Sequence, residues 1–343
     1  MRMAALALVV GCGAAWAGEG LPPGFSISDY ASVCAVDGIG IAPDGVIFAG
    51  NAGCGVGPGD PVWVRRIGVG GSPVENYGES VIDDPDAVAF DMEGMVSGVP
   101  GSVLVGSLIG ANLGRISAIL PSEEIVDLFG PVAGPENSLQ MVMDGDRALV
   151  IDFSDGSVWE ITSEGPALLI AGIGEGVRRG IAVGPGGDIY LSTMLGTIQV
   201  YDAAGGLIDD SFYEGEVALG GVLAFGPGNA FGEALYALNA DGELVAIDED
   251  GKGAVFATDF EGSHAAFGPD GAMYISVTGA DVIRRLSACG ADCNADGVLN
   301  ILDFVCFQGE WQDQTPLGDC DGNGLYNILD FVCFQGLFVG GCE

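Results

Sequence analysis

The sequence has very little positive charge. Its 343 residues include ten Lys and Arg against 48 Asp and Glu, so the formal net charge is −38, and Lys252 is the only lysine. Such an acidic surface repels the phosphates of nucleic acids and of anionic lipids, which argues against both as partners. Beyond the N-terminal segment no apolar run is long enough to cross a bilayer, so we expect no transmembrane segment.

Signatures of common catalytic and zinc sites are missing as well. No G-x-S-x-G motif occurs, so the nucleophile elbow of a Ser-His-Asp hydrolase is not indicated. The C-x-x-C pairs typical of zinc sites are also absent, although the chain has nine cysteines. The cysteines therefore point to disulfides more than to zinc.

The N-terminus has the pattern of a secretory signal. Arg2 is followed by an apolar run and then by Ala15-Trp16-Ala17, which is an A-x-A cleavage pattern. This pattern predicts a signal peptide over residues 1–17, cleavage near Ala17, and a secreted, extracellular or cell-surface protein. The alternative is a lipoprotein that is acylated on Cys12.

Removal of the signal leaves eight cysteines. Six of them lie in residues 289–343, and the other two are Cys34 and Cys54. An even number of cysteines in an oxidising compartment indicates disulfides, which a unit of 55 residues with a thin core needs for stability. Six cysteines allow fifteen pairings, so the connectivity stays open.

The strongest pattern is a repeat near the C-terminus. The segment NILDFVCFQG occurs at 300–309 and again at 327–336, preceded by DCNADGVL and by DCDGNGLY. Each copy forms a twelve-residue loop with oxygen-bearing side chains at positions 1, 3, 5, 9 and 12, Gly at 6, and a backbone carbonyl offered from 7, as in calcium loops. We predict two calcium ions. The predicted ligands are Asp292, Asn294, Asp296, Val298, Asn300 and Asp303 in the first loop and Asp319, Asp321, Asn323, Leu325, Asn327 and Asp330 in the second.

A short helix is expected after each loop. Ile301, Phe304 and Val305 have helical spacing, and Gly309 and Gly336 are predicted to end the two helices. Two loop-helix units without an entering helix resemble the GC-type dockerin modules of secreted bacterial proteins. The resemblance covers residues 289–343 and implies calcium-dependent folding and attachment to a cohesin-like receptor or the cell surface.

The module departs from ordinary dockerins at the positions that contact cohesin. Ile301-Leu302 and Ile328-Leu329 stand where a Ser/Thr pair is usual, and the module has no Lys or Arg. Calcium binding is therefore carried over from the resemblance, whereas cohesin specificity is not.

The body of the chain, residues 18–288, is a second kind of repeat. An apolar pair, a Pro/Asp/Gly turn and an apolar strand recur six times, with steps of 49, 53, 40, 42 and 42 residues between equivalent positions. Units of this size predict a six-bladed β-propeller with four short antiparallel strands in each blade. The equivalent positions are Ile41, Phe90, Met143, Val183, Phe225 and Phe267.

The predicted fold class is therefore mainly β: a six-bladed propeller followed by a small α-helical module. The body resembles the NHL and gluconolactonase-like propellers. A pair of β-sandwiches is the alternative, but it does not explain the repeat length.

The resemblance to gluconolactonase-like enzymes implies a divalent ion at the propeller axis, held by Glu, Asn and Asp. Asp37 stands where the Glu of an E-G-P stretch is expected, and no Pro follows Gly38, so the match is incomplete. His264 is predicted at the start of an inner strand near the axis, bonded to a neighbouring carbonyl or acting as a ligand or proton shuttle. Four further residues are possible axial oxygen donors, although each lies in a turn where Asn and Asp are common: Asn51, Asp152, Asn239 and Asp241.

Three Arg pairs stand out in so acidic a chain: Arg65-Arg66, Arg178-Arg179 and Arg284-Arg285. We expect them to pair with carboxylates at the rim. The alternative for Arg178-Arg179, at the mouth of the fourth blade, is recognition of an anionic sugar.

Together these patterns predict a secreted, calcium-binding, polysaccharide-associated protein. Its propeller binds an unknown protein partner or glycan, and its tail docks to a cohesin-like receptor or the cell surface. The alternative is a metal-dependent lactonase or another sugar-acting enzyme that the tail delivers to its substrate. We favour the non-enzymatic interpretation, and no catalytic residues are assigned.

Overall fold

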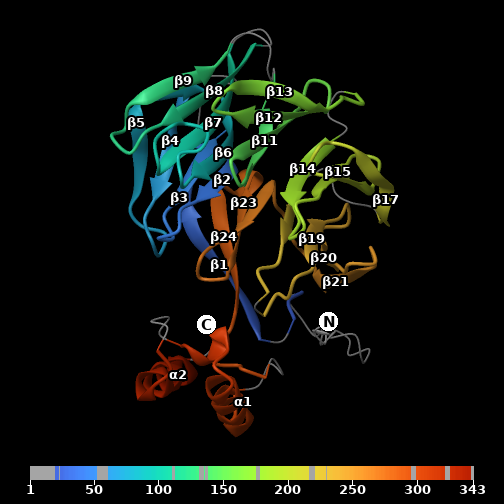
Figure 1. The fold of residues 1–343 in the computed structure, drawn as a ribbon. Coiled ribbons are helices and arrows are strands. Elements are labelled where there is room, and N and C mark those ends of the chain that lie inside the picture. Colours follow the sequence, from blue (N-terminus) through green and yellow to red (C-terminus); the bar gives the residue numbers. More distant parts are fainter. Residues whose placement is uncertain are drawn as a thin grey trace.

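The structure is a computed structural model. It describes residues 20–22, 24–51, 61–109, 113–130, 135, 138–174, 178–215, 221–228, 230–294, 299–320 and 325–340. Figure 1 shows a ring of β-sheets with two helices beneath it.

Six four-stranded antiparallel sheets make up the ring. The first three consist of β2 (Val36–Ile41), β3 (Ile47–Asn51), β4 (Pro61–Ile67) and β5 (Val74–Asp83); β6 (Pro85–Asp91), β7 (Ser102–Ile109), β8 (Leu113–Ile119) and β9 (Ile125–Phe129); and β10 (Ser138–Asp144), β11 (Arg147–Asp152), β12 (Val158–Thr162) and β13 (Gly165–Ile170).

The other three sheets follow the same order. They consist of β14 (Arg178–Val183), β15 (Ile189–Thr193), β16 (Thr197–Tyr201) and β17 (Leu207–Glu214); β18 (Leu223–Phe225), β19 (Leu235–Leu238), β20 (Leu244–Ile247) and β21 (Gly253–Ala257); and β22 (His264–Phe267), β23 (Met273–Val277), β24 (Val282–Ala288) and β1 (Phe25–Ser32). A short 3-10 helix, η1 (Thr278–Ala280), joins β23 to β24.

The ring is closed. The first strands of the six sheets contact one another in the order β2, β6, β10, β14, β18, β22 and back to β2. The prediction of a six-bladed propeller is therefore confirmed, and the alternative of two sandwiches is wrong. In every blade the equivalent position of the repeat lies near the C-terminal end of the inner strand. It pairs there with a residue of the next strand, as Ile41 does with Ile47 and Phe267 with Met273.

Apolar side chains fill the spaces between neighbouring sheets. Between the third and fourth sheets, Leu149, Ile151 and Val158 pack with Ile181, Ile189 and Leu191, and all six are at most 4% exposed. Burial on both faces explains why the strands read as nearly continuous apolar runs.

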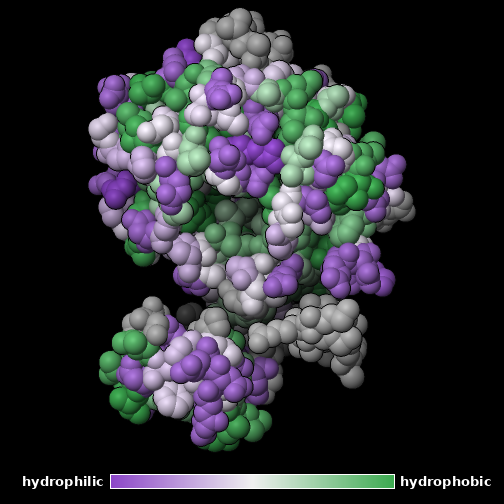
Figure 2. Space-filling model, in the orientation of Figure 1, coloured by the Kyte–Doolittle hydropathy of each residue, from purple (hydrophilic) through white to green (hydrophobic). Residues whose placement is uncertain are grey.

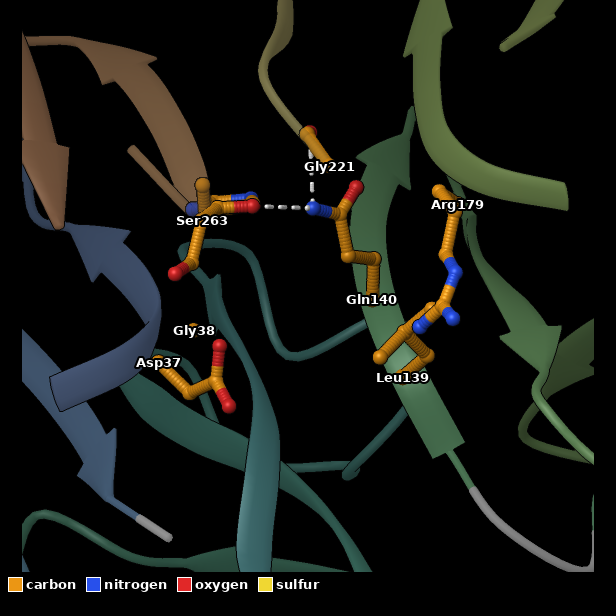
Figure 3. A pocket seen from close by; sticks show the side chains of 8 residues that line it. Asp37, Gly38, Leu139, Gln140, Arg179, Gly221 and Ser263 are labelled. Carbon is orange, nitrogen blue, oxygen red and sulfur yellow. Dashed lines mark hydrogen bonds between the residues drawn. The ribbon is translucent and has the colours of Figure 1, made fainter. Parts of the chain in front are cut away.

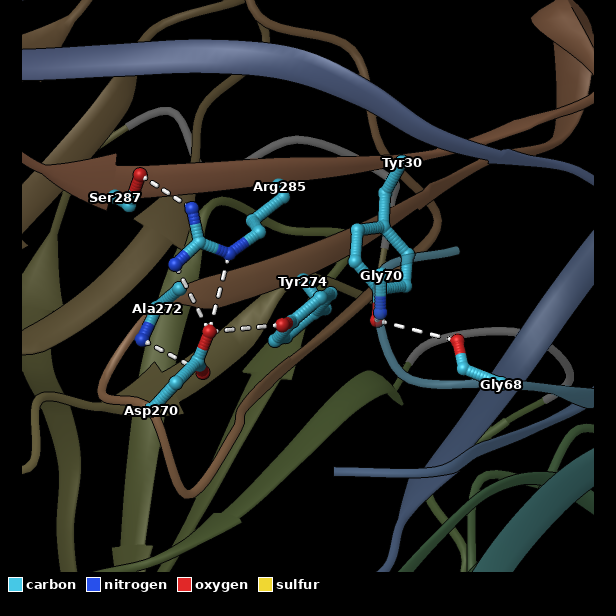
Figure 4. Close-up of polar contacts among 8 residues, drawn as sticks. All are labelled: Tyr30, Gly68, Gly70, Asp270, Ala272, Tyr274, Arg285 and Ser287. Atoms are coloured by element: carbon cyan, nitrogen blue, oxygen red, sulfur yellow. Dashed lines mark hydrogen bonds and ion pairs between the residues drawn. The ribbon is translucent and has the colours of Figure 1, made fainter. Parts of the chain in front are cut away.

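The last blade joins the two ends of the propeller. β1 pairs with β24 from Phe25–Ala288 to Ser32–Val282, so the N-terminal strand completes the sheet that the C-terminal strands begin. Tyr30 of β1 then reaches the first blade, where its hydroxyl accepts a hydrogen bond from the Gly70 amide at 2.8 Å (Figure 4). Arg284 and Arg285 pair with Asp29 and Asp270, which confirms the predicted ion pairs for this Arg pair.

The chain leaves the propeller directly into the C-terminal tail. The Cys289 amide donates to the Gly24 carbonyl at 2.6 Å, and the helices α1 (Ile301–Gln312) and α2 (Ile328–Gly340) follow, with η2 (Pro316–Gly318) between them. Phe307 and Phe334 stack between α1 and α2 with ring centroids 4.3 Å apart.

Both helices start where the sequence predicts, directly after the loops, but they continue past the glycines that were expected to end them. The prediction that Gly309 and Gly336 stop the helices is wrong. The turns after these glycines carry Trp311 and Phe338, whose rings contact Phe331 and Phe304 of the opposite helix. This packing outweighs the cost of a helical glycine, which is about 1 kcal/mol.

Two disulfides connect the loops to the helices. Cys293 pairs with Cys306 and Cys320 with Cys333, so each bond joins the second loop position to the helix that follows. Cys34 and Cys289 each take part in a further disulfide. None of the helices in the described part of the chain has the length and apolar character to span a membrane.

Candidate functional site

Four inner strands carry a β-bulge near their first residue. The register shifts between Val36 and Ile39 in β2, between Pro85 and Ala87 in β6, between Ser138 and Gln140 in β10, and between Arg178 and Gly180 in β14. The bulged residues are Asp37-Gly38, Asp86, Leu139 and Arg179. A bulge turns a side chain out of the regular alternation and is frequent beside functional sites.

A cavity of about 180 Å³ lies at this level of the axis (Figure 3). Because its lining comes from the starts of inner strands on several blades, it is a shared feature of the ring. The residues that line it are Asp37, Gly38, Leu139, Gln140, Arg179, Gly221, Ser263 and His264.

The Gln140 side chain connects four blades at the cavity wall. Its amide nitrogen donates to the carbonyl oxygens of Gly221 at 2.7 Å and Ser263 at 3.2 Å, and its oxygen accepts from the Ile181 amide at 3.3 Å. All of its described hydrogen bonds therefore go to backbone groups, which makes it a structural tie across the axis.

His264 starts β22 and lines the cavity, as the sequence predicts. Its Nδ1 accepts a hydrogen bond from the Ile39 amide of the first blade at 3.4 Å. The partner is therefore an amide and not the carbonyl that was expected. Burial lowers the pKa of His264 to about 4, so the ring is neutral near pH 7 and carries its proton on Nε2.

Ser263 presents an acceptor to the cavity. The Thr278 hydroxyl donates to the Val36 carbonyl at 2.6 Å, so the Ser263 hydroxyl, 2.6 Å from Thr278 Oγ1, must donate to it. The lone pairs of Ser263 Oγ are then left as acceptors.

Carboxyl groups gather on one side of the axis. Burial and then the charge of Asp84 raise the pKa of Asp37 to about 6, whereas Arg179 acts in the opposite direction. Burial, followed by the charges of Asp37 and Asp84, raises the pKa of Asp86 to about 8. Asp86 Oδ1 is buried and has no hydrogen-bond partner. Gly38 is required here because a Cβ would collide with the backbone carbonyl of Asp86.

Arg179 lies across the cavity from these carboxyl groups. Its guanidinium carbon stands 4.5 Å from the centre of the Phe153 ring, and burial lowers its pKa. The rim ion pair predicted for it is wrong, because no described carboxylate lies within ion-pairing distance of Arg179. Arg66 does form such a pair, with Glu75 at 3.5 Å.

The other predicted axial oxygens have hydrogen-bond partners within their own blades. The side-chain amide of Asn51 donates to the Trp63 carbonyl, and the Asp152 carboxylate accepts from the Ser154 amide. The side-chain oxygen of Asn239 accepts from the backbone amides of Asp241 and Glu243. Asp86 and Gln140 do not stand out in the sequence as site residues, because only the bulge in β6 and the hydrogen bonds across the axis distinguish them.

The C-terminal loops form a second candidate site, a metal centre. Asp303 is fully buried; its Oδ2 accepts from the Asn300 amide at 2.7 Å, and its Oδ1 lies 3.5 Å from the Asn294 amide. Asn300 in turn accepts from the Leu302 amide at 2.8 Å, which caps α1. The last loop residue therefore folds back over its own loop.

The second loop repeats this geometry. Asp330 is fully buried, and its Oδ2 accepts from the Asn327 amide at 2.7 Å, while Asn327 Oδ1 accepts from the Leu329 amide at 2.9 Å. Asp330 Oδ1 is buried without a hydrogen-bond partner. A buried carboxylate oxygen without a hydrogen-bond partner at the twelfth loop position is suited to a calcium ion, so these residues fit a hard cation.

The central loop positions are not described. Asp296, Val298, Asp321 and Asn323 lie outside the described residues, whereas Asp292, Asn294, Asp319 and Leu325 lie within them. Over the described part of the chain, no three His, Cys, Asp or Glu side chains are grouped closely enough to hold a metal. The ligand sets predicted from the sequence therefore stay predictions.

Comparison with known proteins gives the fold of the propeller. No family model and no curated protein matches the chain. Among solved structures, a gluconolactonase-like protein is 13% identical with a TM-score of 0.58, covering 79% of this chain and 94% of its own.

Two enzymes of other activities have the same architecture. Virginiamycin B lyase from Staphylococcus aureus is 13% identical with a TM-score of 0.52, covering 77% of this chain and 99% of its own. The PQQ-bound aldose sugar dehydrogenase from Streptomyces coelicolor is 12% identical with a TM-score of 0.54, covering 78% and 100%. At these identities the likeness shows the fold alone.

Proposed function

We propose that this is a secreted docking protein: the tail binds calcium and attaches to a receptor protein, and the propeller presents the axial cavity to a ligand. A cohesin-like protein or another cell-surface component is the receptor class that the dockerin resemblance suggests. The single observation that carries the proposal is an apolar surface that occurs twice on the tail.

The two helices expose the same side chains at the same positions. Ile301 and Ile328 are each 71% exposed, and Figure 2 shows hydrophobic residues on the tail surface. Isolated soluble domains seldom leave so many large aliphatic side chains in water, so we assign this surface to a partner. The repeated surface, named the docking surface below, consists of Ile301, Leu302 and Val305 on α1 and Ile328, Leu329 and Val332 on α2.

Calcium has a structural role in this proposal. Asp303 and Asp330 each use one oxygen to cap a helix, so an ion held through the other oxygen fixes the loop against the helix start. The disulfides connect the same two elements. Ion and disulfide together hold the docking surface in one conformation.

The tail leaves the propeller on the side away from the cavity. In the last blade, His264 pairs with Ser276 at one end of the sheet, whereas Leu286, near the end of β24, pairs with Met273 at the other. Figure 1 shows the tail beneath the ring, beside β1 and β24. A docked molecule would therefore keep its cavity open.

The test is calcium-dependent retention on immobilised cohesin domains. We expect the intact chain to be retained in calcium and released by chelator, and the double variant Ile301→Asp/Ile328→Asp to be lost. Leu317→Asp is the matched control, because Leu317 is 50% exposed but lies outside the docking surface. Retention that survives chelation would contradict the role of calcium, and retention of the double variant would contradict the docking surface.

A second candidate is a lactone- or sugar-acting enzyme, favoured by Asp37 in the axial cavity at the position of the expected Glu. Gluconolactonase-like and sugar dehydrogenase structures share the fold. Hydrolysis of a lactone panel with and without added divalent ions tests it, and activity abolished by Asp37→Asn would support it.

A further inference from the structure

The axial cavity has two opposite charges, and neither has an ion-pair partner among the described residues. Arg179 has no carboxylate within 4 Å, and Asp37 has neither an ion pair nor a hydrogen bond to its carboxylate in the described part of the chain. This is unusual for the chain, since five other arginines are paired with carboxylates: Arg66, Arg115, Arg147, Arg284 and Arg285.

The two charges face one space from different blades. Asp37 comes from the bulge of β2 and Arg179 from the bulge of β14, and Figure 3 shows them on opposite sides of the cavity. The charge of Arg179 lowers the pKa of Asp37, the charge of Asp37 raises that of Arg179, and both side chains are partly removed from water. Partly desolvated charges of opposite sign, too far apart to pair directly, are complementary to a molecule that reaches both.

The uncharged groups divide in the same way. Ser263 Oγ, whose lone pairs are free to accept, lies on the Asp37 side of the cavity in Figure 3. The carboxylate side of the cavity therefore offers two acceptors, and a ligand there must supply several donors. The opposite side has the guanidinium of Arg179, whose parallel N–H groups suit a carboxylate.

We propose that the axial cavity binds a small zwitterion of the α-amino acid class, with its ammonium group on Asp37 and Ser263 and its carboxylate on Arg179. The acidic neighbours Asp84 and Asp86 oppose a ligand with net negative charge, which argues against an anionic sugar. The volume of about 180 Å³ corresponds to roughly six water molecules, so the ligand is small. This site goes beyond the docking function and does not depend on the tail.

The experiment screens the twenty common L-amino acids one at a time by thermal shift, followed by calorimetric titration of each hit. For a hit, the N-acetyl derivative removes the ammonium charge and the carboxamide removes the carboxylate. We expect one site per chain, and at least a tenfold loss of affinity for either derivative. Repeating the titration in chelator separates this result from the behaviour of the tail.

Variants assign the binding to the cavity. Asp37→Asn and Arg179→Gln should each weaken binding at least tenfold, whereas Asp250→Asn and Arg66→Gln, which change exposed ion pairs elsewhere, should leave it unchanged. The carboxamide derivative separates the two contacts. Its loss of affinity comes from the missing contact with Arg179, so this loss should shrink in Arg179→Gln and shrink far less in Asp37→Asn. The proposal is overturned if no amino acid binds the folded protein, if the derivatives bind equally well, or if the cavity variants bind as the wild type does.

Discussion

Single side chains at the axis carry an electrostatic cost in the folded state. Asp37 and Asp86 both have raised pKa values because burial and neighbouring carboxylates disfavour their charged forms. The folded protein therefore holds protons that the unfolded chain releases. Natural proteins keep such strain mainly at functional positions, which agrees with a site at the axis.

Asp86 should make stability fall as pH rises. Its pKa is about 8 in the folded protein against an ordinary value of 3.8, so the free energy of unfolding decreases through the window from about pH 4 to pH 8. Asp86→Asn removes the charge, and we expect it to raise Tm at pH 9 by roughly 2–4 °C, with little change at pH 4. Melting curves across pH measure this, with exposed Asp250→Asn as control. A variant Tm below that of the wild type at pH 9 would show that the carboxylate is not strained.

Asp330 should act in opposite directions with and without calcium. Asp330→Asn removes the charge of a buried carboxylate whose Oδ1 has no hydrogen-bond partner, so we expect the tail to melt higher than wild type in chelator. In calcium the tail of the variant should melt lower than that of the wild type. Its calcium affinity should fall by at least ~10–100-fold, which is the usual cost of losing an outer-shell partner of a metal site. Calorimetry of both forms checks this, with exposed Asp313→Asn as control. If calcium leaves the tail transition of the wild type unmoved, the metal assignment fails.

At the scale of elements, the inner strands are joined by packing and by side-chain hydrogen bonds, among them those of Gln140. Gln140 of β10 bonds backbone groups of Ile181 in β14, of Gly221 before β18, and of Ser263 before β22. Side-chain hydrogen bonds over such sequence separations fix how the blades lie around the axis.

Gln140→Ala should loosen this arrangement. It removes the side-chain donor of the Gly221 carbonyl, whereas the Ser263 carbonyl still accepts from the Gly221 amide. A buried group left unsatisfied costs about 1–3 kcal/mol. We expect a lower urea midpoint for the β-sheet signal, while Gln312→Ala, an exposed amide on α1, has no effect on it. Equal midpoints for the two variants would mean that water replaces the side chain.

The strands and the ring were predictable from the sequence, because the spacing of Ile41, Phe90 and their equivalents reflects a core that repeats with each blade. The axial site was predictable only in part. Asp37, His264 and Arg179 stand out in the sequence, whereas Asp86 and Gln140 do not, since a bulge adds one residue without changing the apolar pattern around it. Asp86 becomes recognisable only when the register is known. The helix ends were also missed, because Gly309 is outweighed by aromatic contacts from the other helix.

At the scale of the whole molecule, the ring depends on an N-terminal strand to close it. β1 is the only strand of the last blade that comes from the start of the chain, and it pairs with β24 along seven residue pairs. Without β1, β24 becomes an open edge and Tyr30 no longer connects the last blade to the first.

A chain without residues 1–32 should therefore fail to form a closed ring. We expect it to aggregate or to melt in a broad, less cooperative transition. A chain without residues 1–17, which is the predicted mature protein and keeps β1, should melt in one cooperative transition. Circular dichroism and size-exclusion chromatography distinguish the two. A cooperative monomer lacking β1 would show that five complete blades and three strands are sufficient.

The position of β24 between β1 and β23 has a mechanical consequence. If the tail docks as proposed, a pull on it in the direction of β24 enters the propeller at Ala288, the last residue of that strand. The hydrogen bonds to β1 on one side and to β23 on the other then bear the force together, in shear, and do not open one by one like a zipper. The sheet that completes the ring would then also take the tension, with the N-terminal strand as its clamp.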